Sequence, residues 1–248
     1  MTQEFGKIIG EHGLQNSKLA VAVSGGIDSV VLCELCHQTK LAFIMVHCNF
    51  GLRGEESSRD ETFVRSLASK YNVPVIVEHF NTASYAEAQK ISIQEAARDL
   101  RYSWFKKLQT EAVYDYILLA HHADDNVETT LMNFFRGTGI EGLTGIPVSI
   151  PHVKGIRPLL HHTRQEIIAF ARQNELQWVE DSSNESVKYT RNFFRHEVLP
   201  LVKKVYNHAD ENVLDNIERF KGINAVYQWG VARLKDKVCR KHKSEVHV

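Results

Sequence analysis

The chain has 248 residues, of which 43% are hydrophobic and 24% charged, and these proportions exclude a disordered or fibrous protein. No stretch approaches 18 uninterrupted apolar residues, and the N-terminus lacks the basic start and apolar run of a secretory signal. Four cysteines at uneven spacing (Cys33, Cys36, Cys48 and Cys239) do not suit a disulfide framework. We therefore expect a cytoplasmic protein without a membrane partner.

The formal net charge is zero, but the charges are unevenly distributed along the chain. Residues 1–183 carry 17 Lys and Arg against 22 Asp and Glu, whereas residues 184–248 carry 13 against 8. Such an asymmetry is typical of a protein whose basic end faces a polyanion. A solvated basic helix is the plainer interpretation, and charge alone favours it.

Strand and helix patterns alternate over the first half of the chain. Short apolar runs predict buried parallel strands at residues 19–23, 41–46, 73–77 and 116–120. Apolar residues at helical spacing predict helices at residues 28–38, 56–71, 92–108 and 124–135. This alternation predicts an α/β fold with a doubly wound, mostly parallel sheet of about five strands.

The second half of the chain reads as mainly helical. Residues 137–155 predict a loop with a short strand, and residues 163–174 a helix that Thr163 and Glu166 cap together. Residues 181–190 predict a loop, followed by helices at 191–205, broken by Pro200, and at 212–238. We expect one domain over residues 1–205 and a helical extension over residues 206–248.

The strongest local signal is a glycine-rich loop between the first strand and the first helix. It consists of Ser24, Gly25, Gly26, Ile27, Asp28 and Ser29. Glycines allow the backbone to approach an anion, the following helix N-terminus favours negative charge, and the serine hydroxyls add donors. The loop therefore predicts a pyrophosphate nest, although it matches neither the Walker nor the Rossmann pattern.

Asp28 sharpens this prediction. A carboxylate beside a phosphate nest would repel the ligand unless a cation lay between them, so Asp28 is a candidate Mg²⁺ ligand. Its plainer role is that of an acidic residue in the first turn of a helix.

Further motifs follow in order along the chain. The first is His47 to Ser57, which contains Leu52-Arg53-Gly54, and the second is Gln94 to Tyr102, which contains Arg98 and Arg101. The third is Ala120 to Thr129, which contains His121-His122-Ala123-Asp124-Asp125. Arg136 to Ile146 comes next, and the last is Asp181 to Arg195, which contains Tyr189-x-Arg191-Asn192-x-x-Arg195. Over roughly residues 18–205 the series resembles the tRNA(Ile)-lysidine synthetases, a family of PP-loop ATP pyrophosphatases. Phe50 stands where that family often has a histidine.

The resemblance implies an ATP-dependent ligase. ATP would adenylate the C2 oxygen of the wobble cytidine in an isoleucine tRNA with a CAU anticodon, and free L-lysine would then displace AMP. ATP is a substrate, Mg²⁺ the implied metal, and residues 206–248 would begin a truncated tRNA-binding domain. The oligomeric state stays open, with a homodimer as one alternative.

The resemblance also assigns candidate roles to residues. The catalytic candidates are Asp28, Asp125, Arg101 and Arg195, and Asp28 and Asp125 are the candidate metal ligands. ATP-binding candidates are residues Ser24 to Ser29, His47 and His121, and tRNA-binding candidates are Arg53, Arg98, Arg136, Arg191 and Asn192. Asp125 ranks only narrowly above Asp124, and each arginine has the plainer role of a solvated or ion-paired surface charge.

Three alternatives remain beside this hypothesis. Cys33-Glu34-Leu35-Cys36 has the spacing used by related PP-loop tRNA thiolases, but its place in a core-facing helix favours small buried side chains. An amide-forming ligase would need an ammonia source. A tRNA-binding module with a degenerate site is disfavoured because the candidate site residues are intact, namely Ser24, Asp28, Asp125 and Arg101.

Overall fold

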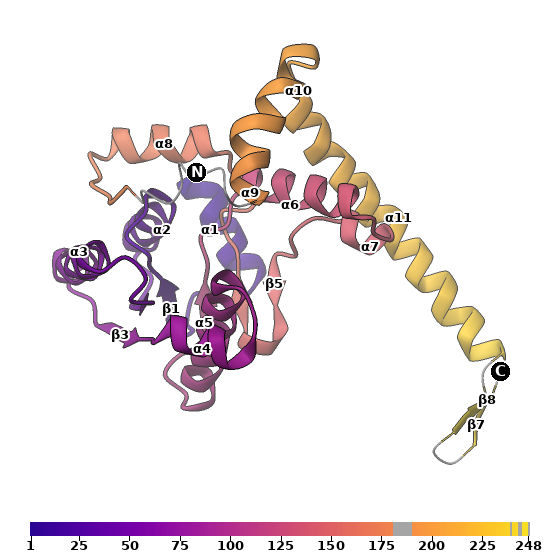
Figure 1. Ribbon diagram of the computed structural model, residues 1–248, viewed down its shortest axis with the longest axis horizontal. Coiled ribbons are helices and arrows are strands. Elements are labelled where there is room, and N and C mark those ends of the chain that lie inside the picture. The colour runs from indigo at the N-terminus through magenta and orange to yellow at the C-terminus, as the bar shows by residue number, and fades with distance from the viewer. Residues whose placement is uncertain (181–189, 239, 243–244, 248) are drawn as a thin grey trace. The chain divides into compact units, whose positions relative to one another are not determined.

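The computed structural model describes residues 1–180, 190–238, 240–242 and 245–247 of the chain (Figure 1). Cys239 and the motif residues Asp181, Ser183, Asn184 and Tyr189 lie outside the described residues. The chain forms two compact units: residues 1–123 with 148–183, and residues 124–147 with 184–248. The predicted boundary between residues 205 and 206 stays a prediction.

The first unit is built on a six-stranded sheet with the order β3-β2-β1-β4-β6-β5. The strands are β1 (Leu19–Ala22), β2 (Phe43–Asn49), β3 (Val75–His79), β4 (Tyr116–Leu118), β5 (Ser149–Ile150) and β6 (Gly155–Ile156). All neighbours pair in parallel except β5, which pairs antiparallel with β6. The expected mostly parallel sheet is confirmed, with β5 and β6 arising from the glycine- and proline-rich segment.

Side chains of the central strands alternate between two cores, one on each face of the sheet. Leu19 and Val21 of β1 join one apolar cluster, while Ala20 between them joins the other. In β4, Leu118 faces the first cluster and Ile117 the second. Because both faces are covered, these strands are apolar at every position, which is why they read as uninterrupted runs.

Helices cover both faces of this sheet (Figure 1). They are α1 (Thr2–Glu11), α2 (Ile27–Gln38), α3 (Glu55–Tyr71), α4 (Thr82–Gln89), α5 (Ile93–Thr110), the 3₁₀ turn η1 (Pro151–Val153) and α8 (Arg164–Gln173). Residues of α1, α2, α3 and α8 share the first core, and residues of α5 share the second. The chain from β1 to β3 runs outward in one direction, whereas β4 pairs on the other side of β1. The strand order therefore switches direction between β1 and β4.

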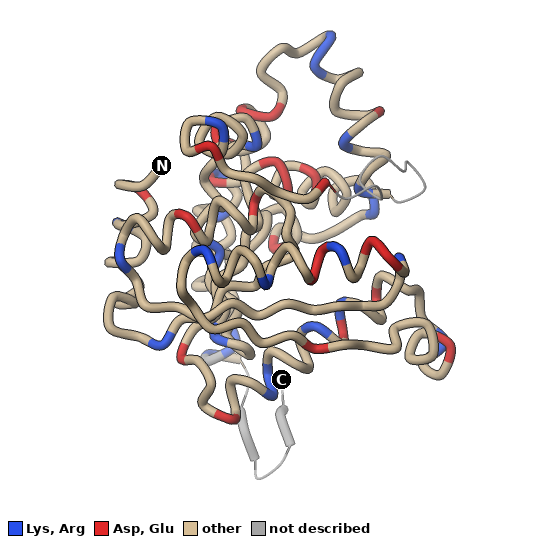
Figure 2. Tube along the Cα trace, turned by 90° about the vertical axis from the view of Figure 1, so that its left-hand side faces the viewer, with Lys and Arg blue, Asp and Glu red and all other residues tan. Residues whose placement is uncertain are grey.

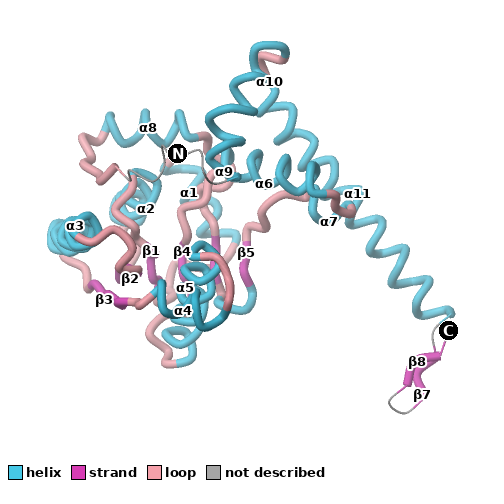
Figure 3. Tube along the Cα trace, in the orientation of Figure 1, coloured by secondary structure: helices cyan, strands magenta, loops and turns pink. Residues whose placement is uncertain are grey.

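The second unit is helical, apart from a terminal two-stranded sheet (Figure 3). Its elements are α6 (Ala123–Arg136, whose first residue belongs to the first unit), α7 (Ile140–Leu143), α9 (Thr190–Phe193), the π-helical turn η3 (Phe194–Val198), α10 (Leu199–Val205), α11 (Ala209–Val238), β7 (Arg240–His242) and β8 (Glu245–His247). The loop after α6 is held by Asn126, whose side-chain oxygen accepts a hydrogen bond from the Ile146 amide at 2.6 Å. Helix α11 packs against α7 and α10, and its Ile217 is buried.

Some elements differ from the sequence-based expectation. Helices α1 and α4 were not predicted, and the helical path from Thr190 to Val205 is not broken at Pro200. Pro200 is the second residue of α10, directly after the π-helical turn η3, and the backbone on its N-terminal side keeps helical dihedral angles. Thr163 and Glu166 form the predicted capping box of α8. No helix in the described residues is long and apolar enough to cross a membrane.

Candidate functional site

The glycine-rich loop follows the carboxyl end of β1, beside the point where the strand order switches direction. Ligands of open α/β sheets bind at this kind of position. The Gly26 amide donates to the Ser24 hydroxyl oxygen at 3.3 Å, and the Ser29 hydroxyl donates to the Gly26 carbonyl at 2.8 Å. Gly25 has φ +94°, a conformation that side chains rarely adopt, so the turn requires glycine there. The loop thus has the compact turn and the helix N-terminus expected of a phosphate nest.

Asp28 lies in the first turn of α2 and is not isolated. Its carboxylate forms an ion pair with Arg164, the first residue of α8, and the His122 Nε2 lies 3.9 Å from the same oxygen. The Asp28 side chain is 28% exposed, so a ligand can reach it. The structure therefore joins the loop, the histidine motif after β4 and the start of α8.

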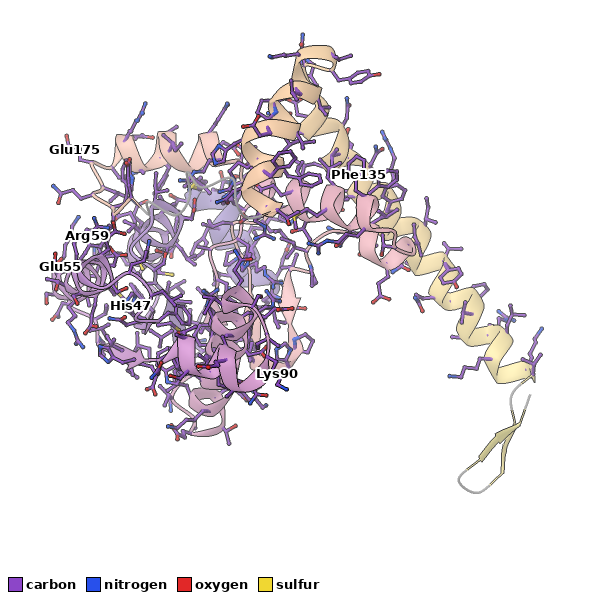
Figure 4. The ribbon with its side chains drawn as sticks, in the orientation of Figure 1. His47, Glu55, Arg59, Lys90, Phe135 and Glu175 are labelled. Atoms are coloured by element: carbon purple, nitrogen blue, oxygen red, sulfur yellow. The ribbon has the colours of Figure 1, made fainter. Side chains whose placement is uncertain are left out.

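His47 lies near the carboxyl end of β2 and is buried (Figure 4). Its Nδ1 lies 2.7 Å from the Val23 carbonyl oxygen, immediately before the glycine-rich loop. Burial lowers the pKa of His47 below its usual value, although this hydrogen bond opposes the shift. In a neutral ring, Nδ1 donates to the carbonyl and Nε2 is left as an acceptor. His47 thus buttresses the loop through the backbone.

An ion-paired network occupies the end of β2 and the start of α3. Arg53 pairs with Asp60 at 2.9 Å, so this candidate for tRNA binding already has a carboxylate partner. Glu61 accepts hydrogen bonds from Asn49, Arg65 and His79. Burial raises the pKa of Glu61, but these three donors outweigh it and bring the value to about 2.

Arg98 and Arg101 project from α5 toward aromatic rings. The Arg98 guanidinium lies 5.0 Å from the Tyr102 ring centre, and that of Arg101 lies 5.3 Å from the Phe50 ring centre. Arg101 also contacts Cys48, whose pKa burial raises to about 12. Phe50, where the family often has histidine, therefore serves as a platform for the Arg101 side chain.

In the second unit, α6 and the segment after residue 189 form an arginine–carboxylate cluster. The Glu128 side chain is 1% exposed and holds Arg195 in a fork, with contacts of 2.6 and 3.1 Å. The same guanidinium lies 3.4 Å from the Asp125 carboxylate. Arg191 contacts Glu128 at 3.6 Å and donates to the Thr129 hydroxyl at 2.9 Å. Burial raises the pKa of Glu128. The positive charges of Arg195 and Arg191 lower it, but by less than burial raises it.

The remaining candidates differ in exposure. Arg136 is exposed at the end of α6, while His121, Asp124 and Asn192 are partly buried. Cys33 and Cys36 are fully buried in α2, and burial raises the pKa of both thiols. The expectation of small buried side chains in this pair is confirmed.

Two residues of these clusters were missed as site candidates. Glu128 was not predicted as a site residue, because its burial depends on how the fold covers this face of α6. Arg164 could have been identified from the sequence, because it directly follows the N-cap Thr163, where the helix dipole disfavours a cation. In the structure, the Asp28 carboxylate supplies an anion beside this position.

Residues 1–202 match the PP-loop domain family. The chain is 41% identical over 225 residues to the tRNA(Ile)-lysidine synthase of Bacteroides thetaiotaomicron, covering 91% of this chain and 52% of that protein. It is 43% identical over 208 residues to the tRNA(Ile)-lysidine synthase of Chlorobaculum tepidum, covering 82% and 62%. The chain spans about half the length of the curated relatives it matches.

Among solved structures, the chain is similar to the U34-tRNA thiolase NcsA from Methanococcus maripaludis, described with its iron–sulfur cluster. The TM-score is 0.72 at 19% identity, and the match covers 88% of this chain and 77% of that one. At this identity the likeness concerns the fold alone.

Proposed function

Because the chain belongs to the PP-loop domain family, we propose that it carries out ATP-dependent ligation of free L-lysine to C2 of the wobble cytidine in an isoleucine tRNA with a CAU anticodon. The observation that carries the proposal is the nest after β1 with Asp28 in the next turn, in a chain 41% identical to a tRNA(Ile)-lysidine synthase. We also propose the cytoplasm as its location, because tRNA and ATP are available there.

In the first step, the cytidine C2 oxygen attacks the α-phosphorus of ATP. The bond from that phosphorus to the bridging oxygen breaks, and pyrophosphate leaves. Amide groups and hydroxyls of residues 24–29, together with the positive end of α2, stabilise the charge that builds up on pyrophosphate. His47 holds the loop in place through the Val23 carbonyl.

A magnesium ion fits this chemistry. Protein sites for Mg²⁺ commonly use one or two carboxylates and take further oxygens from substrate phosphates and water. The described residues contain no group of three or more potential metal ligands, so phosphate oxygens would complete the coordination. Asp28 would hold the ion in the first unit. Asp125, which belongs to the second unit, is proposed as a metal ligand in its own right. When bound, the ion would neutralise charge on the phosphates.

In the second step, the ε-amine of lysine attacks C2 of the adenylated cytidine. The bond from C2 to the phosphate-linked oxygen breaks, AMP leaves, and the amine releases a proton. We propose that Arg101 and Arg195 stabilise phosphate charge, and that His47 and His121 contact the nucleotide. The tRNA would be held by Arg53, Arg98, Arg136, Arg191 and Asn192.

The test is lysine-dependent release of AMP and pyrophosphate from ATP with the cognate tRNA. Asp28→Ala should abolish pyrophosphate release while tRNA affinity, measured by filter binding, stays unchanged. Asp99→Ala, which removes an exposed carboxylate from α5, is the matched control and should retain activity. Turnover without lysine, or transfer of sulfur to the tRNA, would contradict the proposed reaction. Circular dichroism separates a folding defect in the Asp28 variant from a chemical one.

A further inference from the structure

Arg164 occupies an unusual place for a cation. It is the first residue of α8, directly after the N-cap Thr163, where the exposed amide groups of a helix create a positive potential. Its guanidinium forms an ion pair with Asp28, which stands in the first turn of α2 directly after the phosphate nest. The carboxylate thus compensates for the unfavourable position of the arginine.

The backbone around Arg164 is tied to the other loops at this end of the sheet. The His162 carbonyl accepts a hydrogen bond from the Ala123 amide at 2.8 Å, next to the His121-His122 motif. The segment after α8 returns to the nest, where the Val179 amide donates to the Gly25 carbonyl at 3.0 Å. Reciprocal hydrogen bonds between Thr163 and Glu166 hold the first turn of α8. The arginine is therefore anchored through its backbone beside the nest.

The side chain, in contrast, is able to change partners. It is 38% exposed and has several rotatable bonds, so reorientation does not require movement of α8. A guanidinium fork binds carboxylates and phosphates with the same planar pairs of hydrogen bonds. While Arg164 holds Asp28, part of that carboxylate is occupied and cannot serve a cation. A phosphate chain in the nest would offer Arg164 a second, more highly charged anion.

We propose that Arg164 is a phosphate-binding residue for ATP and its pyrophosphate product, which transfers from Asp28 to the phosphate chain when the nest is filled. The proposal rests on the proposed use of ATP. Before nucleotide binds, the ion pair with Arg164 neutralises the charge of Asp28 at the N-terminus of α2. After the transfer, both oxygens of Asp28 become available to a cation, and the arginine adds positive charge to the leaving group.

Inorganic pyrophosphate is the probe, with affinity measured by isothermal titration calorimetry on the whole chain without tRNA. Arg164→Met should weaken pyrophosphate binding by about ten- to a hundredfold, the effect of losing a charged hydrogen-bond pair. Arg164→Lys keeps the charge but not the fork and should show an intermediate loss. Arg172→Met, an exposed arginine in the last turn of the same helix, should stay within about twofold of the wild type.

A double-mutant cycle with Asp28→Asn tests the transfer itself. With divalent ions chelated, Asp28→Asn should strengthen pyrophosphate binding, because Arg164 no longer has to leave a carboxylate. That gain should be smaller in the Arg164→Met background, where Asp28→Asn relieves only the repulsion between the carboxylate and pyrophosphate. A gain in the Arg164→Met background that equals or exceeds the gain in the wild type overturns the transfer.

Two further outcomes separate this inference from the proposed function. Unchanged pyrophosphate affinity in both Arg164→Met and Arg164→Lys would overturn the role of Arg164 and leave ATP use intact. A folded wild-type chain that binds neither pyrophosphate nor ATP would instead overturn the proposed function. Thermal unfolding of each variant shows whether it is folded, and Arg164→Lys serves where Arg164→Met does not fold.

Discussion

Glu61 shows how a single carboxylate organises the loop that follows β2. Asn49, Arg65 and His79 all donate to it, and the Asn49 side-chain oxygen accepts from the Gly51 amide at 3.1 Å. Gly51 has φ +64°, so the chain turns sharply at this point. The carboxylate therefore determines how the segment leading to Arg53 leaves the sheet.

The low pKa of Glu61 leads to a prediction about stability and pH. A folded-state pKa of about 2 lies below the unfolded value, so the charged group stabilises the fold above pH 4.5 and this contribution is lost as the pH falls toward 2. Glu61→Gln should cost about 2 kcal/mol at pH 7, and the difference from wild type should shrink between pH 4.5 and 2.

Urea unfolding across this pH range is the measurement. Glu11→Gln removes an exposed partner of Lys7 and should change stability by less than about 0.5 kcal/mol. A difference between wild type and Glu61→Gln that does not vary with pH would show that the donors bind the neutral side chain equally well.

At the scale of single elements, the ends of helices and the turns between them carry the site. Two helices of the first unit begin with a capping box, α5 at Ser92 and α8 at Thr163. The two boxes are chemically equivalent, but only α8 begins with a residue that contacts Asp28. Variants of the two N-caps therefore distinguish a general loss of stability, expected for both helices, from a loss of ligand binding, expected for α8 alone.

Thr163→Ala and Ser92→Ala should each lower the free energy of unfolding by about 1 kcal/mol, because each removes one cap acceptor. Only Thr163→Ala should also weaken pyrophosphate binding, since fraying of α8 displaces Arg164. Denaturant unfolding and calorimetry on the two variants provide the comparison. Equal pyrophosphate affinity in both would show that the first turn of α8 does not position the arginine.

The loop after α6 makes a second prediction at this scale. Gly145 has φ +74°, and an added Cβ would lie 2.1 Å from the Asn126 side-chain oxygen that accepts from Ile146. Gly145→Ala should therefore cost about 2–4 kcal/mol, through backbone strain and loss of that hydrogen bond.

Gly139 is the matched position in the same loop, with φ −75° and open space around its Cβ. Gly139→Ala should cost less than about 1 kcal/mol. Thermal unfolding of both variants checks the contrast. Similar melting temperatures would mean that the Asn126 side chain moves away from the added methyl group without loss of stability.

At the scale of the whole molecule, the balanced charge of the chain is the sum of unlike parts. Charges of both signs are spread along the trace (Figure 2), yet residues 184–248 carry an excess of five positive charges. In α11, Arg233 and Lys235 are exposed, and the Arg233 guanidinium lies 5.2 Å from the Trp229 ring centre. Exposed cations beside an aromatic ring suit an RNA surface.

If α11 contacts tRNA, reversal of its charges should weaken RNA binding. Arg233→Glu with Lys235→Glu should lower tRNA affinity and reduce the slope of log affinity against log salt by about 2, because two phosphate contacts are lost. Pyrophosphate affinity should not change. Lys106→Glu with Lys107→Glu, on the exposed side of α5, is the control pair. An equal loss in both pairs would mean that net charge, and not α11, governs binding.

The sequence by itself determined the α/β class, the positions of β1 to β4 and the glycine-rich turn after β1. These features depend on neighbouring residues: apolar runs, helical spacing and glycines are local and can be read in one pass. The buried pair Cys33 and Cys36 was predicted for the same reason, because α2 lies against the core. Helix α4 was not predicted, because its apolar residues do not recur at helical spacing.

Only the tertiary structure decided which charged side chains meet. Asp28 and Arg164 stand 136 positions apart, and Arg195 and Glu128 stand 67 apart, so no local pattern couples them. The sequence suggested phosphate or RNA for Arg53, Arg98, Arg101 and Arg195, whereas the fold pairs Arg53 and Arg195 with carboxylates and sets the other two against aromatic rings. A buried or half-buried charge needs a partner, and which partner it obtains depends on how strands and helices bring distant segments together.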